Sequence, residues 1–124
     1  VKEIKSGAVR MAAVAKVPIV PVAVWGGQRI WTKGRPKRII RGQTISIAVG
    51  EPMTVTTRDD MEAASAALRA RLQELLDDVQ AAHPATAAPG PDAWWLPAHL
   101  GGTAPTPEEA QAMDAADRAA RSAD

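Results

Sequence analysis

The sequence has no cysteine and only two histidines among its 124 residues. Without thiols the chain can form no disulfide bond and offers no thiolate to a metal ion. The histidines, His83 and His99, stand sixteen positions apart with few carboxylates nearby, a pattern that matches no spacing of metal ligands. We expect no metal ion and no cofactor, and we interpret both histidines as exposed residues of a linker, outside any nucleophile–base pair.

Long apolar runs are also missing. The longest, Val17 to Trp25, has nine residues and contains two prolines, whereas a membrane-spanning helix needs about 20 apolar residues. We therefore expect no transmembrane segment. The sequence does not begin with basic residues followed by an apolar stretch, so it does not indicate a signal peptide. Because residue 1 is Val, we expect the chain to begin within a longer protein.

Acidic residues are scarce in the first third of the chain. Residues 1–42 hold ten Lys or Arg against Glu3 alone, a net charge of +9, whereas residues 43–82 and residues 83–124 each carry −4. The formal net charge of +1 hides this asymmetry. We expect the first third to contact anions.

Hydrophobic patterning predicts an α/β domain over residues 1–82, in the order helix, strand, strand, helix. Ala, Val and Met dominate a helix expected over 6–16, and the β-branched run at 18–25 predicts a strand covered on both faces and interrupted near Pro21. Alternating residues predict a second strand over 43–52. A long helix is expected after a Thr57–Asp60 capping box, because apolar residues recur at steps of three and four: Met61, Ala64, Leu68, Leu72, Leu75 and Val79.

Residues 83–124 differ in composition and are rich in Ala, Pro, Gly and Asp. We expect a flexible low-complexity tail, with one short helix over 107–120 behind a Thr106 cap and Glu109. Trp94 and Trp95 are unusual in such a tail. They fit docking on the domain, contact with a bilayer interface or contact with a partner.

The loop between the two predicted strands concentrates positive charge. Trp31 stands among six cations: Arg29, Lys33, Arg35, Lys37, Arg38 and Arg41. Such a loop fits three roles: contact with the phosphate head groups of a membrane surface, contact with nucleic-acid phosphates, or a solvated connector.

Two blocks near the start of the chain resemble a known family. A Lys-x-Gly segment, Lys5 to Gly7, opens the first predicted helix, and a Val-Pro-Ile-Val-Pro-Val block, Val17 to Val22, follows that helix. This order is similar to the second half of the 1-acylglycerol-3-phosphate acyltransferase domain of the lysophospholipid acyltransferase family. The resemblance extends over residues 1 to about 82, includes "VGEP" at 49–52, and implies a partial glycerophosphate-acyltransferase-like sandwich.

The chain also departs from that family. The family's catalytic signature, a His followed after four residues by an Asp, is absent, because Ala88 and Ala104 stand five positions beyond His83 and His99. A Phe-Pro-Glu-Gly block is absent too, and Ile4 stands where Phe is usual. The resemblance therefore implies the carboxy-terminal portion of an acyltransferase, which holds no catalytic residue and is inactive alone.

The resemblance implies transfer of a fatty acyl group from an acyl-CoA or acyl-carrier-protein thioester to lysophosphatidic acid in phospholipid synthesis. It implies a peripheral protein on the cytoplasmic side of the cell membrane.

For the lysophosphatidic acid site the resemblance implies charge and backbone contacts from Lys5, Gly7 and Arg10. A groove wall, or simply core, is implied for Pro18, Ile19, Val20 and Pro21. For the membrane surface we expect Arg29, Trp31, Lys33, Arg35, Lys37 and Arg38, and we favour the membrane over nucleic acid. The alternative function is a non-catalytic module that binds anions on a membrane surface or a nucleic acid.

Overall fold

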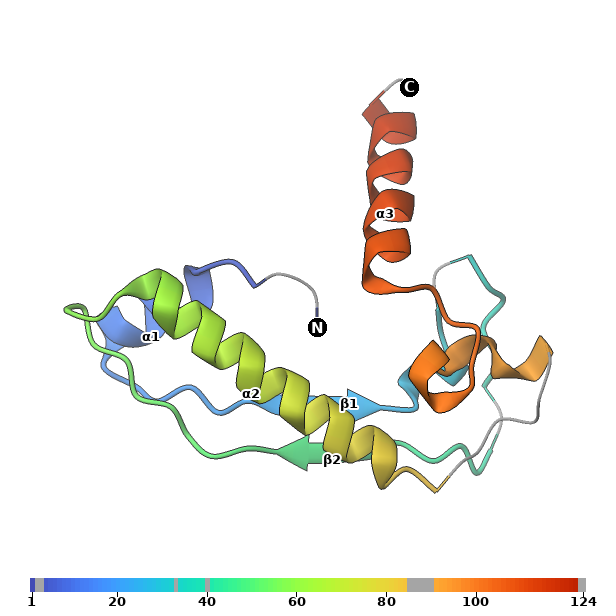
Figure 1. Cartoon of the computed structure of the whole chain (residues 1–124), viewed down its shortest axis with the longest axis horizontal. Helices are drawn as coiled ribbons and strands as arrows, with labels where there is room; N and C mark the ends of the chain where they lie inside the picture. Colours follow the sequence, from blue (N-terminus) through green and yellow to red (C-terminus); the bar gives the residue numbers. More distant parts are fainter. Residues whose placement is uncertain (2–3, 33, 40, 85–90, 123–124) are drawn as a thin grey trace. The chain divides into compact units, whose positions relative to one another are not determined.

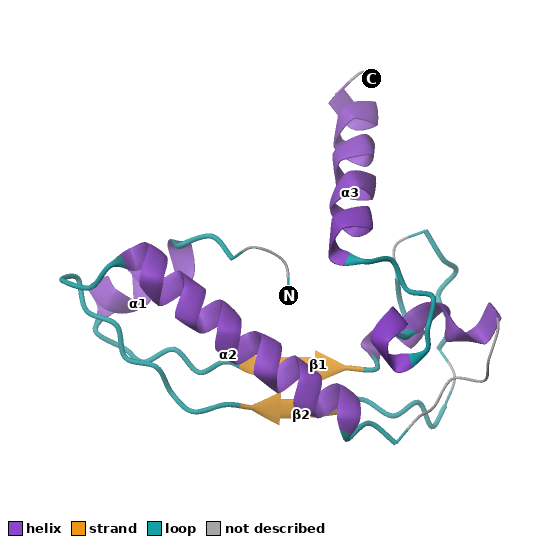
Figure 2. Cartoon of the chain, viewed as in Figure 1, coloured by secondary structure: helices purple, strands orange, loops and turns teal. Residues whose placement is uncertain are grey.

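The computed structural model describes residues 1, 4–32, 34–39, 41–84 and 91–122 (Figure 1). Within these residues the protein is mixed α/β, with three α-helices and a two-stranded antiparallel sheet packed against a helix (Figure 2). The chain divides into two compact units, Val1–Pro84 and Ala85–Asp124.

The first unit follows the expected order of helix, strand, strand, helix. It consists of α1 (Gly7–Ala15), β1 (Val22–Trp25), the short 3₁₀ helix η1 (Gly27–Arg29), β2 (Ser46–Val49) and α2 (Met61–Ala81). Helix α2 crosses the two strands and covers one face of the sheet (Figure 1). The predicted order of elements is confirmed.

The strands pair in register Val22↔Val49, Ala23↔Ala48, Val24↔Ile47 and Trp25↔Ser46. Before β1 the chain makes an isolated bridge between Ile19 and Met53, and Gly50 N then donates to Pro21 O at 2.9 Å. Pro21 stands between the bridge and the ladder because its nitrogen has no hydrogen to donate. The expected interruption near Pro21 is confirmed.

The expectation of a strand covered on both faces is wrong. Helix α2 covers the face that carries Ala23, Trp25, Ser46 and Ala48, and Ala23 is buried. The opposite face is open: Val22, Val24, Ile47 and Val49 are 46, 56, 64 and 65 % exposed. Ala23 and Ala48 pair on this face, and their small side chains allow the helix to approach the sheet closely there. A Cβ on Gly50 would lie only 2.8 Å from Leu75 Cδ1.

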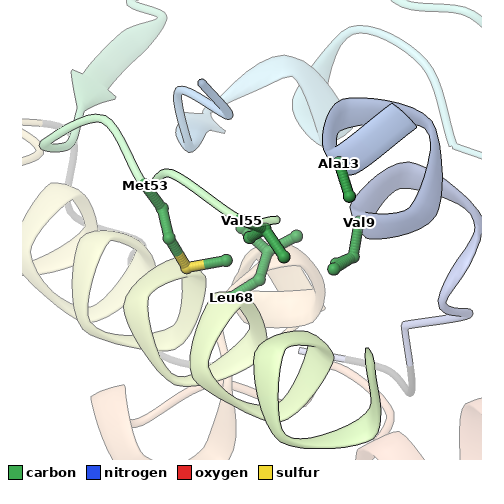
Figure 3. Packing of buried hydrophobic residues seen from close by; sticks show 5 residues of the cluster. All are labelled: Val9, Ala13, Met53, Val55 and Leu68. Carbon is green, nitrogen blue, oxygen red and sulfur yellow. The ribbon is translucent and has the colours of Figure 1, made fainter. Parts of the chain in front are cut away.

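The core of the first unit joins both helices to the segment that follows β2. Val9 and Ala13 extend from α1, Leu68 from α2, and Met53 and Val55 from the connecting chain (Figure 3). Five partly buried residues pack around this cluster: Ile4, Ile19, Met61, Ala64 and Leu72. The apolar face predicted for α2 is therefore the face that it buries.

The start of α2 differs from the expected capping box. Asp60, not Thr57, is the N-cap, and its Oδ1 accepts from Glu62 N at 2.9 Å and Ala63 N at 3.3 Å. Asp59 is used one step earlier, where its Oδ2 accepts from Thr56 N at 2.6 Å. Asp60 directly precedes the helix, so its carboxylate can accept hydrogen bonds from the first amides. The Thr57 hydroxyl stands three residues earlier and does not reach these amides.

The second unit contains 3₁₀ helices η2 (Pro91–Trp95) and η3 (Ala98–Leu100) and helix α3 (Pro107–Ser122). Ala93 and Trp95 are buried, and Gly102 N, Thr103 N and Ala104 N donate back to Pro97 O, Ala93 O and Leu96 O. Thr106 and Glu109 form a reciprocal capping box: Thr106 N donates to Glu109 Oε2 and Glu109 N to Thr106 Oγ1. This region therefore buries more, and has more regular structure, than its low-complexity composition predicts.

None of the described helices combines the length and the hydropathy that a bilayer crossing requires.

Candidate functional site

A cleft of about 670 Å³ opens between the start of α1 and the first half of α2. On α2 the lining positions 62, 65, 66 and 69 recur at helical spacing, so they share one face. The chain just before α1 forms the opposite wall. The lining residues are Ile4, Lys5, Ser6, Glu62, Ser65, Ala66 and Arg69.

The described residues that line the cleft include two cations and one carboxylate. Lys5 faces it from one wall, and Arg69 and Glu62 from the other. Arg69 is held in place, because its Nε and Nη2 donate to Val1 O at 3.2 and 2.8 Å. The Ser65 hydroxyl is buried and donates to Met61 O at 2.7 Å, so it can only accept a further hydrogen bond.

The amino end of α1 adds to the positive potential of the cleft. Ser6 is its N-cap, but the Ser6 side chain makes no cap hydrogen bond to the first amides. Its Oγ instead accepts from Arg10 Nε at 3.2 Å. Amides at a helix start that receive no side-chain cap favour an anion, as does the helix dipole.

The structure separates the residues expected at the acceptor site into two places. Lys5 lines the cleft and Gly7 begins α1 beside it, whereas Arg10 lies one turn further on and reaches back to Ser6. The block at 18–21 lies outside the cleft lining. Ile19 packs against the core and Pro21 is buried, while Pro18 and Val20 are exposed. The sequence did not predict Arg69 as a residue of this site. Arg69 stands seven residues, or about two helical turns, after Glu62, and this spacing places both residues on the face of α2 that lines the cleft.

The basic loop between β1 and β2 is closed by its own hydrogen bonds. Arg38 N donates to Ile30 O at 2.9 Å, Trp31 N to Gly27 O at 3.1 Å, and Thr32 Oγ1 to Gln28 O at 2.8 Å. Trp31 is 67 % exposed, and Lys37 Nζ lies 4.4 Å from the centroid of its ring. Of the residues expected at a membrane surface, Arg29, Trp31, Arg35, Lys37 and Arg38 belong to this loop, and Lys33 lies outside the described residues.

The interpretation of His83 as an exposed linker residue is wrong. His83 is only 8 % exposed, and its Nδ1 lies 2.7 Å from the Ser46 hydroxyl on β2. Burial lowers the pKa of the imidazole, and the Arg29 charge lowers it further. Helix α2 extends to Ala81 and so carries His83 over the end of the sheet, whereas His99 is exposed as expected.

The Ser46–His83 pair has the composition of a nucleophile and its base. Ser46, however, lies on the face of the sheet that α2 covers, and the His83 ring packs beside Gly26, where a Cβ would lie 3.1 Å from Cε1. The hydroxyl is therefore turned into the fold. We assign the pair to holding the end of α2 on the sheet.

Comparisons of the chain with models of protein families, with curated proteins and with solved structures give no significant match. Among the described residues, no three His, Asp or Glu side chains gather into a group that could hold a metal ion. The function must therefore be inferred from the chain's own residues.

Proposed function

We propose that this chain is part of an acyltransferase that moves a fatty acyl group from an acyl-CoA or acyl-carrier-protein thioester to 1-acylglycerol-3-phosphate in phospholipid synthesis. One observation carries the proposal: the Lys-x-Gly segment that resembles the acyltransferase family forms a wall of the cleft, with Arg69 on the other wall. The chain contains no His-x₄-Asp sequence. Its part in the reaction is therefore to bind the acceptor rather than to remove the hydroxyl proton.

The chemistry of the cleft suits the acceptor's phosphate. Lys5 supplies a compact positive charge, and Arg69, whose Nε and Nη2 donate to Val1 O, adds a second positive charge at the cleft. Helix α1 starts directly after Lys5 and Ser6 of the cleft wall, and its first amides, which receive no side-chain cap from Ser6, favour an anion. Glu62 at the cleft repels a second anion and can accept a hydrogen bond from a glycerol hydroxyl.

The open face of the sheet supports a larger domain. Its four side chains are large and β-branched, the residue types that normally fill the space between two layers. Within the described part of the chain the sheet has two strands, so no further strand pairs with either outer edge. Further layers of a glycerophosphate-acyltransferase-like sandwich would cover this face. We place the whole enzyme peripherally on the cytoplasmic side of the cell membrane, where both its substrate and its product reside.

The primary test is thioester-dependent acylation of lysophosphatidic acid, run on this chain and on the product of the complete reading frame that encodes it. Activity in the longer product alone supports the proposal. In that product Lys5→Met raises the apparent KM for lysophosphatidate, because the phosphate loses one cation. Absence of activity in both products favours the alternative, a non-catalytic anion-binding module.

A second test uses this chain by itself. Binding of lysophosphatidate, measured by calorimetry below its micelle concentration, weakens in Arg69→Gln. Arg71→Gln is the matched control, because Arg71 lies on the same helix, outside the cleft lining, and its Nη1 faces Glu51 O at 3.4 Å. Equal losses in both variants would mean that the cleft is not the phosphate site.

A further inference from the structure

The basic loop exposes apolar side chains as well as cations. Trp31 is 67 % exposed and Ile39 is 86 % exposed, and both lie within the loop that joins β1 to β2. Exposed aliphatic side chains are common singly, but an isoleucine this open beside an exposed tryptophan and several cations is a combination that suits an interface.

Charge of one sign surrounds these apolar groups. No Asp or Glu occurs from Ile4 to Gly50. Lys37, Arg38 and Arg41 are all exposed in the loop. Such a surface complements a bilayer that contains anionic lipids, and each cation near that bilayer strengthens binding.

Described residues from the two halves of the loop lie close together. The Arg38 N to Ile30 O bond, at 2.9 Å, brings the residues before Trp31 next to the residues before Ile39. Lys37 lies over the Trp31 ring, so insertion of the indole at the interface places the ammonium group at the level of the lipid phosphates.

We infer that this loop anchors the protein to anionic membranes, with Trp31 and Ile39 entering the interface and Lys37, Arg38 and Arg41 contacting lipid phosphates. Ile39 distinguishes a membrane from a nucleic acid as the partner. Single strands are held by phosphate contacts and by stacking on aromatic rings, and an aliphatic side chain offers no stacking surface. A bilayer interface, by contrast, removes the Ile39 side chain from water.

The inference rests on the membrane association proposed above but requires neither thioester nor lysophosphatidate. The experiment is therefore flotation of this 124-residue chain with vesicles of phosphatidylcholine and with vesicles that also contain phosphatidylglycerol. We expect binding to the anionic vesicles only, and weaker binding as salt is added. The flotation result does not depend on acyltransferase activity, so either proposal can fail without the other.

Two variants separate the apolar from the charged contribution. Ile39→Ser weakens binding to the anionic vesicles about tenfold, because one buried aliphatic side chain is lost. The triple variant Lys37→Gln, Arg38→Gln, Arg41→Gln weakens it roughly a hundredfold, at about fivefold for each cation. The controls Met113→Ser and Arg58→Gln remove an exposed apolar side chain and an exposed cation elsewhere, and leave binding unchanged.

Fluorescence quenching locates the indole. Brominated lipids quench part of the emission of the wild-type chain, and Trp31→Phe removes that part. Three results would overturn the inference: equal binding to neutral vesicles, unchanged binding by Ile39→Ser, or tighter binding to a single-stranded oligonucleotide than to anionic vesicles.

Discussion

Replacing Gly26 by alanine should destabilise the first unit more than the same replacement at any other glycine of that unit. Gly26 follows β1 and has a φ of 103°, in the region that residues with a side chain rarely adopt. A Cβ there would lie 2.5 Å from Thr44 O and 3.1 Å from His83 Cε1. The added methyl group would therefore collide both with Thr44, just before β2, and with His83, just after α2.

The magnitude follows from two costs. Holding an alanine at this φ costs about 1–3 kcal/mol. The contact with a backbone oxygen forces a shift of the chain, and overpacking of this kind costs about 1–3 kcal/mol more. We expect a loss of roughly 2–6 kcal/mol in the free energy of unfolding, a large part of the 5–15 kcal/mol that is typical of a domain.

The neighbouring glycine provides a matched control. Gly27 has no positive φ, and nothing lies within 4 Å of the position of its Cβ. Gly27→Ala should stabilise the protein by about 0.4–1 kcal/mol, because it restricts the unfolded chain. Urea unfolding followed by circular dichroism and tryptophan fluorescence compares the two variants. If their urea midpoints coincide, the close approach of β1, β2 and α2 at Gly26 is incorrect.

Three further predictions test other contacts. The pKa of His83 is lowered in the folded protein, so as the pH falls the unfolded chain binds this proton before the folded chain does. The contribution of His83 to the free energy of unfolding is therefore fully present above the ordinary pKa of 6.5 and decreases as the pH falls through that value. Urea midpoints across this range should show the decrease, and His83→Gln should make the decrease smaller. Asp60→Ala should cost about 1 kcal/mol in thermal unfolding through loss of the N-cap, while Thr57→Ala changes nothing, and equal effects would reinstate the capping box that includes Thr57. Ile47→Thr should alter the free energy of unfolding by less than about 0.5 kcal/mol in urea unfolding, since Ile47 is 64 % exposed; a large loss of stability would mean that this face is covered.

Periodicity in the sequence was enough to predict α2 and the order of the first four elements. Leu68 and Val79 are buried where the three- and four-residue steps place them, and Pro21 interrupts pairing because it lacks an N–H. These features depend on residues close together along the chain, so a local pattern is sufficient to reveal them.

Features that depend on distant residues were not predictable in this way. Alternation identifies the two faces of β2 but not the one that α2 covers, and the helix covers the face of Ser46 and Ala48. The burial of His83 results from a partner 37 positions away, Ser46, and no local pattern contains that contact. Arg69 lines the cleft for the same reason, because its position opposite Lys5 depends on how α1 and α2 pack.

The two proposals together determine how α2 must lie at a membrane. Arg69 lines the cleft, whereas the end of α2 at Ala81 leads to His83, which contacts the strand just after the basic loop. At 1.5 Å per residue, Arg69 and Ala81 are about 18 Å apart along the helix.

If α2 stood upright on the membrane with the loop at the surface, the cleft would lie about 18 Å above the lipid phosphates. One leaflet of hydrocarbon is only about 15 Å thick, so a lysophosphatidate whose chain stays in the bilayer could not bring its phosphate to Lys5 and Arg69. We therefore expect α2 to lie along the membrane plane. Nitroxide labels at Ala67 and Asp78, which are exposed and lie eleven residues apart on one side of the helix, should then show equal accessibility to a water-soluble relaxation agent on anionic vesicles. An upright helix would separate them by about 16 Å in depth, and that result would require lysophosphatidate to leave the bilayer before it binds.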